Sequence, residues 1–240
     1  TPRLCDMARV TILEGHGEQV ILPFSLLKPS ISAKTARMQA AHQCGTSENC
    51  IEDIFPCTPL QEGLLAMTVK RPGDYVSRNV LELEEGINIG QFRKAWEKVI
   101  WMTPILRTRI FDLRGQGLVQ VVIADLPEWK TGRDLESYIK ENKQTQMGLG
   151  TPLVQFALVE DDKSSKRFFV WAQHHAVYDG WSMSLVLEQV KAAYKGGQLD
   201  RLVPFQGFVK HITENSISQR RLRYGQRGQY SQHATRSRLM

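Results

Sequence analysis

Long hydrophobic runs are missing from this 240-residue sequence, and cysteine is scarce. No apolar stretch approaches the roughly 18 residues that a membrane-spanning helix needs, and no signal-peptide pattern is found, so we expect no membrane partner. The four cysteines, Cys5, Cys44, Cys50 and Cys57, all lie in the first quarter and match no zinc-ligand spacing. The sequence therefore predicts free thiols in a cytoplasmic protein.

Acidic residues are absent from residues 216–240, where six arginines stand without a lysine. This tail carries the whole net charge of +6, because residues 1–215 hold 25 basic and 25 acidic side chains. A basic tail without aromatic side chains interleaved on a folded face is weak evidence for nucleic-acid binding. We expect a disordered end and no nucleic-acid partner.

A hydrophobic content of 42% is enough for a sizeable core, and its periodicity alternates between strands and helices. The clearest helical stripe consists of Phe92, Ala95, Trp96, Val99 and Ile100. Strands are expected at 75–83, 105–112, 118–124 and 152–159 and from Phe168 onward, and further helices at 135–147 and 182–193. This alternation, with helices covering both sheet faces, predicts an α/β sandwich.

The first 70 residues give weaker patterns. A short helix is expected over 4–10, a strand over 19–27, and a polar, alanine-rich stretch over 32–43. Thr58 followed by Pro59 is typical of a helix start, because threonine accepts from free amides and proline suits the first helical position. Leu60, Leu64 and Met67 then recur at helical spacing, which predicts that this stripe packs inward.

The run from Phe168 to Trp181 is the most informative stretch of the sequence. Apolar residues lead into two adjacent histidines, His174 and His175, and Asp179 and Gly180 follow four residues later. Side chains alternate faces along a strand, so the two imidazoles should point in opposite directions. One histidine should therefore pack inside while its neighbour faces a cleft at the strand end.

A neutral imidazole can accept a proton near pH 7, and a nearby carboxylate can orient such a ring or tie a turn to a cation. The glycine would let the backbone approach a ligand. A metal site built from His174, His175 and Asp179 is an alternative, but adjacent strand residues point apart. We therefore expect no metal ligands here.

The spacing HHxxxDG at 174–180, PxTPLQEGL at 56–64 and LRT at 106–108 resemble the condensation domain of fungal-type nonribosomal peptide synthetases. This family belongs to the chloramphenicol-acetyltransferase-like superfamily, and the resemblance implies a two-layer α/β sandwich that forms one lobe of a normally two-lobed fold. It further implies a carrier-domain end and linker at 1–50, the N-terminal lobe at 51–212 and a tail at 213–240. Segments of a second lobe are not recognised after residue 212.

The resemblance also implies roles for individual residues. His175 matches the family's catalytic histidine, Asp179 its structural aspartate and Gly180 its backbone-donor glycine. His174 would be the packing partner, and Trp181 a supporting residue. Because a buried carboxylate needs a cation or several donors, Arg107 is the expected partner of Asp179.

The implied activity is amide-bond formation between aminoacyl or peptidyl thioesters, with His175 as general base or amine-positioning residue. Carrier (thiolation) domains would supply the 4'-phosphopantetheine arm, an adenylation domain would be a further partner, and no cofactor would bind directly. Epimerising and cyclising subtypes are close alternatives. From another class, the chain could be an inactive remnant or a carrier-docking module without the second lobe.

Overall fold

A computed structural model describes residues 20–200 and 203–214. The helix expected over 4–10 and nearly all of the basic tail lie outside these residues. The helices are α2 (Ala33–Cys44), α3 (Pro59–Lys70), α4 (Ile89–Met102), α5 (Leu135–Gln144) and α6 (Gly180–Tyr194), with short 3-10 turns η1 (Glu48–Cys50) and η2 (Pro104–Arg107) and a final helix over 205–214. The strands are β1 (Ile51–Pro56), β2 (Val76–Leu83), β3 (Thr108–Leu113), β4 (Gly117–Ile123), β5 (Trp129–Gly132), β6 (Val154–Asp161) and β7 (Lys166–His174).

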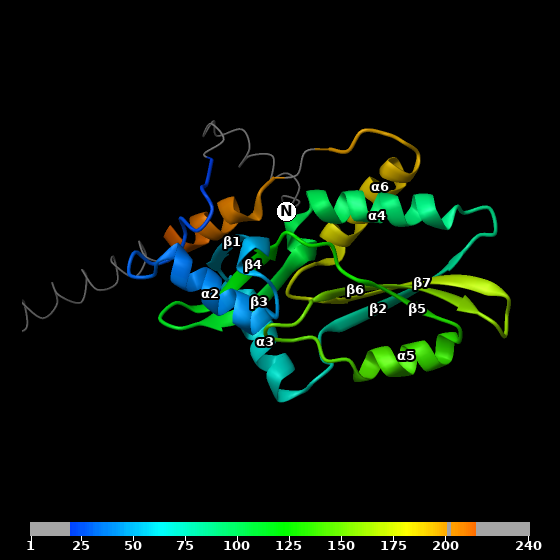
Figure 1. Ribbon diagram of the computed structural model, residues 1–240, viewed down its shortest axis with the longest axis horizontal. Helices are drawn as coiled ribbons and strands as arrows, with labels where there is room; N and C mark the ends of the chain where they lie inside the picture. The colour runs from blue at the N-terminus through cyan, green and yellow to red at the C-terminus, as the bar shows by residue number, and fades with distance from the viewer. Residues whose placement is uncertain (1–19, 201–202, 215–240) are drawn as a thin grey trace, which may run out of the picture.

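The strands form two sheets (Figure 1). The smaller sheet has the order β1-β4-β3 and is antiparallel throughout, and its β3–β4 hairpin turns between Leu113 and Gly117, within the gap between the two strands expected there. The larger sheet has the order β2-β7-β6-β5, with only the β5–β6 pair parallel. Strand β7 thus lies inside the larger sheet, hydrogen-bonded on both edges, which agrees with its apolar sequence.

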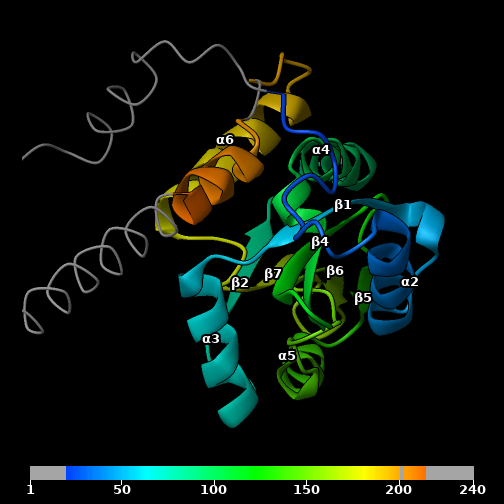
Figure 2. The same ribbon diagram turned by 90° about the vertical axis from the view of Figure 1, so that its left-hand side faces the viewer.

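Helices cover both faces of the larger sheet, as the sequence predicted. Figures 1 and 2 show α4 and α6 side by side on one face and α5 on the other. The stripe of α4 is buried through Ala95, Trp96, Val99 and Ile100. On the opposite face Tyr138 of α5 packs against the sheet. The α/β sandwich expected from the sequence is therefore present.

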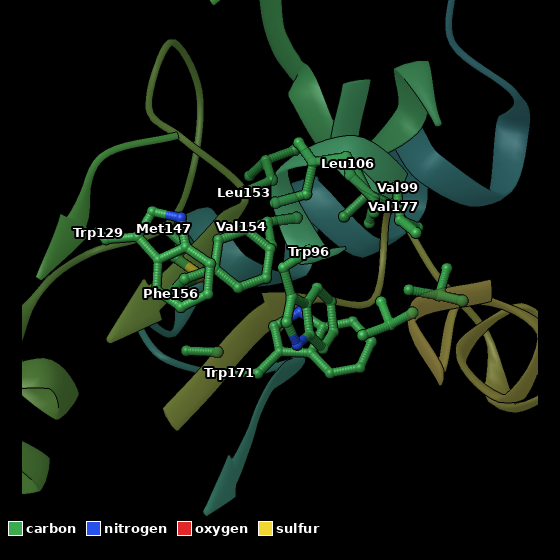
Figure 3. Packing of buried hydrophobic residues seen from close by; sticks show 14 of the residues in the cluster. Trp96, Val99, Leu106, Trp129, Met147, Leu153, Val154, Phe156, Trp171 and Val177 are labelled. Carbon is green, nitrogen blue, oxygen red and sulfur yellow. The ribbon is translucent and has the colours of Figure 1, made fainter. Parts of the chain in front are cut away.

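An aromatic cluster fills the space between α4 and the larger sheet (Figure 3). Trp96 lies at its centre, with its ring centroid 4.8 Å from that of Trp171 and 5.3 Å from that of Phe156. Each such aromatic pair stabilises the fold by about 0.5–1.5 kcal/mol beyond its burial. Because Trp171 and His174 belong to the same strand, this cluster fixes the strand that carries the histidines.

Two expectations for the first 70 residues were wrong. Residues 20–27 form turns rather than a strand, with Phe24 in a left-handed conformation at φ 64°. Helix α3 does begin at the predicted Thr58–Pro59 pair, but Leu60 and Met67 are exposed. Its buried face instead carries Gln61, Leu65 and Thr68. Polar side chains are buried there because the structure offers them specific hydrogen-bond partners, which periodicity alone does not reveal.

The segment before residue 51 packs on the smaller sheet. Ala36, Ala40 and Cys44 of α2 are buried against strands β1, β3 and β4, so part of the expected linker shares the core of the following lobe. At the other end, Val209 of the helix over 205–214 is buried against Phe55 and Val122. That helix extends to residue 214, so residues 213 and 214 do not belong to an irregular tail.

Candidate active site

Strand β7 ends by placing two neighbouring histidines in opposite environments. His174 is fully buried, whereas His175 is exposed. The two histidines thus differ in environment as predicted, although β7 ends at His174 and His175 begins the turn that follows. Only the imidazole of His175 is accessible to a substrate.

His174 joins helix α3 to the turn at residues 175–177, which we call the histidine turn. Its Nδ1 accepts from the backbone N–H of Ala176 at 3.0 Å, so the ring hydrogen is assigned to Nε2. Nε2 then donates to the Thr68 hydroxyl oxygen at 2.8 Å, and that hydroxyl donates to the carbonyl of Leu64 at 3.0 Å. Every polar atom of the buried ring is satisfied in its neutral form, which is the role of a structural residue.

The stability of the fold should depend on the protonation of His174. Burial lowers the pKa of His174 from its usual 6.5 to about 4, and His175 is a smaller cause. The unfolded chain therefore takes up this proton at higher pH than the folded chain. We expect the free energy of unfolding to fall as the pH drops from about 6.5 to about 4, by about 3 kcal/mol at most. Urea unfolding across this range measures the loss.

The matched variant is His174→Asn, which has no titrating ring at this position. Other groups titrate between pH 4 and 6.5 in both proteins, so the difference between the two pH profiles isolates His174. The variant should be less stable at neutral pH and less sensitive to acid. Parallel profiles for the two proteins would contradict the prediction.

Gln61 connects the histidine turn to the smaller sheet. Its side-chain amide donates to the carbonyl of Ala176 and to the side-chain carbonyl of Gln120 on β4, both at 2.9 Å. Gln120 in turn donates to the carbonyl of Pro56 at 3.1 Å. Both glutamines are buried, so these bonds lie in a medium where a missing partner costs about 1–3 kcal/mol. The turn that follows His175 is thus held by a buried polar network.

His175 itself is held by two tyrosines. Its backbone N–H donates to the carbonyl of Tyr75 at 2.8 Å. The hydroxyl of Tyr178 lies 3.0 Å from His175 Nε2, and the two rings stack with centroids 4.4 Å apart. The exposed imidazole is therefore restrained by its neighbours.

Asp179 caps helix α6 and does not contact Arg107. Its carboxylate accepts from the backbone N–H of Ser182 at 2.7 Å, and the Ser182 hydroxyl accepts from the backbone N–H of Asp179 at 2.8 Å. The Ser182 N–H is the main reason that the pKa of Asp179 lies below its usual value. Asp179 is exposed, so its charge needs no buried cation. The expected pairing with Arg107 was wrong.

Arg107 is buried and has other partners. Its guanidinium forms a two-bond ion pair with Glu52, at 2.9 and 3.0 Å. It also donates to three backbone carbonyls, those of Ile100, Trp101 and Ile123. These contacts tie the end of α4 to strands β1 and β4. Arg107 thus supports the fold of the lobe, and all its nitrogen atoms are engaged away from the histidines.

Gly180 and Trp181 begin helix α6. A Cβ added to Gly180 would meet no atom within 4 Å, so the described residues do not require glycine there. The side chain of Trp181 is 70% exposed. Neither residue is explained by packing.

The three residues considered for a metal do not converge. His174 points inward to Thr68, His175 outward to Tyr178, and Asp179 caps a helix. Within residues 20–200 and 203–214, no group of three or more histidine, cysteine or acidic side chains could hold a metal ion.

In the same ranges no helix is long and apolar enough to cross a membrane, and Cys44, Cys50 and Cys57 are free thiols. Cys5 lies outside the described residues.

Sequence reasoning missed four residues around the histidines. Gln61 and Thr68 were overlooked because the helix that carries them was interpreted as apolar packing. Tyr178 lies inside the informative run but received no role. The cap made by Asp179 could have been found, because a polar residue three positions before Ser182 at a helix start is the pattern of a reciprocal cap. Tyr75 acts through its backbone, which leaves no signal in its side chain.

Comparisons with known proteins point to one family. The chain is 51% identical over 214 residues to the nonribosomal peptide synthetase ungA' of Aspergillus campestris, and 39% identical over 214 residues to the peramine synthetase ppzA of Metarhizium rileyi. Each alignment covers 89% of this chain. It covers only 2% of the ungA' synthetase and 7% of the ppzA synthetase. The chain thus spans a small part of the length of the curated relatives that it matches.

Solved structures share the fold. A structure described as SeMet-CT matches with a TM-score of 0.65 at 21% identity, covering 81% of this chain and 45% of that one. The starter condensation domain of the rhizomide synthetase RzmA matches with a TM-score of 0.58 at 17% identity, covering 71% of this chain and 47% of that one. These matches confirm the expected fold class, and the chain spans less than half of each solved structure.

The family model for the condensation domain matches residues 51–226, which is most of the chain. The match includes the PxTPLQEGL, LRT and HHxxxDG segments. The resemblance inferred from these motifs is therefore confirmed. The chain belongs to the condensation-domain family.

Proposed function

We propose that this chain provides the histidine-bearing lobe of a condensation domain that forms amide bonds in nonribosomal peptide synthesis. The observation that carries the proposal is the split pair at the end of β7, with His174 buried as a neutral structural ring and His175 exposed beside the start of helix α6. Membership of the condensation-domain family gives this geometry its chemical meaning.

The reaction joins the amine of one thioester-bound substrate to the acyl carbon of another. The amine nitrogen attacks the thioester carbonyl, the C–N bond forms and the C–S bond breaks, so the nitrogen loses a proton and the leaving sulfur gains one. A neutral imidazole at His175 can take the first proton and return it to the thiolate. His175 can also act mainly by orienting the amine, because positioning often contributes more than proton transfer.

The substrates would arrive on partner proteins. The relatives named as nonribosomal peptide synthetases support carrier domains as partners, with the 4'-phosphopantetheine arm attached to the carrier and not to this chain. An adenylation domain of the same assembly would load the carriers, and the cytoplasm would be the compartment. Within the chain we propose the lobe at 51–212, preceded by a carrier-domain end and linker.

A reconstituted assay tests the function. One carrier domain is loaded with a donor aminoacyl group and a second with an acceptor amino acid, and the chain is added. We expect mass spectrometry to detect the dipeptidyl group on the acceptor carrier, formed faster than in the absence of the chain. No acceleration at any chain concentration would contradict the proposal.

A carrier-docking module without catalysis is the second candidate. The observation in its favour is that the described residues leave the imidazole of His175 exposed, with Tyr178 as its one hydrogen-bond partner among them. The same reaction mixture separates the two functions when carrier binding is measured by titration calorimetry. Binding of a loaded carrier without amide formation would support docking, and amide formation would exclude a purely docking role.

Gly180→Ala tests whether a ligand approaches the start of α6. The added Cβ meets open space, so we expect the free energy of unfolding to change by less than about 1 kcal/mol. If the substrate lies against this backbone, the methyl group displaces it and the rate of amide formation falls about 10- to 100-fold. Thermal unfolding and the carrier assay measure the two effects.

The matched control is Gly63→Ala, because Gly63 is also helical and also has open space around an added Cβ. This variant should keep both stability and rate. If Gly180→Ala keeps the full rate as well, Gly180 does not contact the substrate.

A further inference from the structure

Tyr178 is the only described side chain with a hydrogen-bond contact to the imidazole of His175. The two rings are nearly parallel, with an interplanar angle of 20° and centroids 4.4 Å apart. The Tyr178 hydroxyl lies 3.0 Å from Nε2. Tyrosine therefore covers one face of the ring, while the rest of this exposed side chain remains open to solvent.

The backbone of His175 is fixed independently of this contact. Its N–H donates to the carbonyl of Tyr75, which has a left-handed backbone at φ 61°. Such a conformation is uncommon for a bulky aromatic residue and persists only where surrounding contacts hold it. Strand pairing contributes here, because β2 begins at the next residue, Val76, which pairs with His174 of β7. With the backbone held, the remaining freedom of His175 lies in the rotation of its side chain.

Exposed side chains usually exchange between rotamers on a picosecond to nanosecond timescale, which would leave the imidazole wrongly oriented for much of the time. A stacked ring limits this motion. Rotation of the His175 side chain about its Cα–Cβ bond or its Cβ–Cγ bond would break the stack with Tyr178 or move Nε2 away from the Tyr178 hydroxyl. The buried bonds of Gln61 and His174 to the same turn keep residue 178 in place relative to residue 175.

We propose that Tyr178 is a positioning residue for His175, which fixes the plane of the imidazole by stacking and the place of Nε2 through its hydroxyl. This inference rests on the proposed function for its effect on turnover, but the restraint itself is a property of the free chain. Tyr178 acts through His175 and takes no proton from the substrate.

The test separates stacking from hydrogen bonding with two variants of the full chain. Tyr178→Phe keeps the ring and removes the hydroxyl, whereas Tyr178→Leu removes both. The readout is the rate at which diethyl pyrocarbonate modifies His175, followed by tandem mass spectrometry of the peptide that contains both histidines. The reagent needs a free, neutral imidazole nitrogen, so it reports how strongly Tyr178 restrains and shields the ring. His174 is buried and serves as an internal measure of folding, because it is modified only when the lobe opens.

We expect Tyr178→Leu to raise the modification rate at His175 about 2- to 10-fold, which is the range that a stacked aromatic pair typically provides. Tyr178→Phe should give a smaller increase, and His174 should stay protected in both. In the carrier assay kcat should fall more in Tyr178→Leu than in Tyr178→Phe, with KM nearly unchanged in both. Tyr194→Phe is the control, because it removes a hydroxyl that accepts from the backbone N–H of Asn88, far along α6 from the histidine turn.

Two outcomes would overturn the proposal. One is an unchanged rate at His175 in Tyr178→Leu while His174 remains protected. The other is faster modification of His175 by the reagent in Tyr178→Leu while kcat stays unchanged in a chain that forms the amide. The restraint would then have no role in turnover. If the chain without substitutions forms no amide at all, the proposed function fails. The rates of reagent modification at His175 still decide whether Tyr178 restrains the ring.

Discussion

The chain carrying His175→Ala is expected to form the amide about 10²–10⁴ times more slowly than the unmodified chain, the range typical for loss of a general base. The structure explains why the effect should appear in the rate and not in folding. His175 is exposed, and among the described residues its imidazole hydrogen-bonds only to Tyr178, so alanine leaves no buried cavity and no unsatisfied interior group there. Single-turnover kinetics with two loaded carriers measure the effect.

His42→Ala is the control for this experiment, because His42 is also exposed but lies on α2. It should keep the full rate. A rate for His175→Ala within about threefold of the unmodified chain would be far below the loss of a general base, and His175 would lose its assigned role.

Replacing Gly150 by alanine is expected to destabilise the fold by about 2–5 kcal/mol. Gly150 has φ 75°, which costs a residue with a side chain about 1–2 kcal/mol. In addition, an added Cβ would lie 2.4 Å from the backbone carbonyl oxygen of Gln43, near the end of helix α2, and overpacking of this kind costs about 1–3 kcal/mol. Because α2 packs on the smaller sheet, relief of the clash has to move a packed helix.

Gly148→Ala provides the comparison within the same loop. An added Cβ at Gly148 meets no atom within 4 Å, so this variant should stay within about 0.5 kcal/mol of the unmodified chain. Urea unfolding of both proteins at neutral pH measures the difference. Equal stability of the two variants would show that α2 does not hold the position described here.

The elements with strong periodicity were predictable from the sequence. Helix α4 was found from its apolar residues at helical spacing, and strand β7 from its apolar run. The structure places β7 between two neighbouring strands. Opposite orientations of His174 and His175 were expected from strand geometry, because successive side chains alternate along a strand. In the structure the strand ends at His174, and the turn that follows exposes His175. The start of α3 was also found, since the preference of threonine and proline for helix starts is local.

Contacts between distant segments were not predictable in the same way. Arg107 was expected beside Asp179, but 72 positions of chain separate them, and a sequence does not say which of several carboxylates a guanidinium will meet. Glu52 meets it because β1 lies next to β4. The inward face of α3 was assigned to leucine and methionine because hydrophobicity was the only available criterion, whereas the structure buries Gln61 and Thr68 against partners from β4 and β7.

The sequence by itself determined which residue we propose for the chemistry, since strand alternation separates the two imidazoles and the family resemblance of the HHxxxDG spacing selects His175. Tertiary structure alone decided what holds that imidazole: a carbonyl from Tyr75, the ring of Tyr178 and a buried network that begins at Gln61. The physical reason is that alternation and capping depend on neighbouring residues, whereas hydrogen bonds between buried polar groups depend on which segments the folded core brings together.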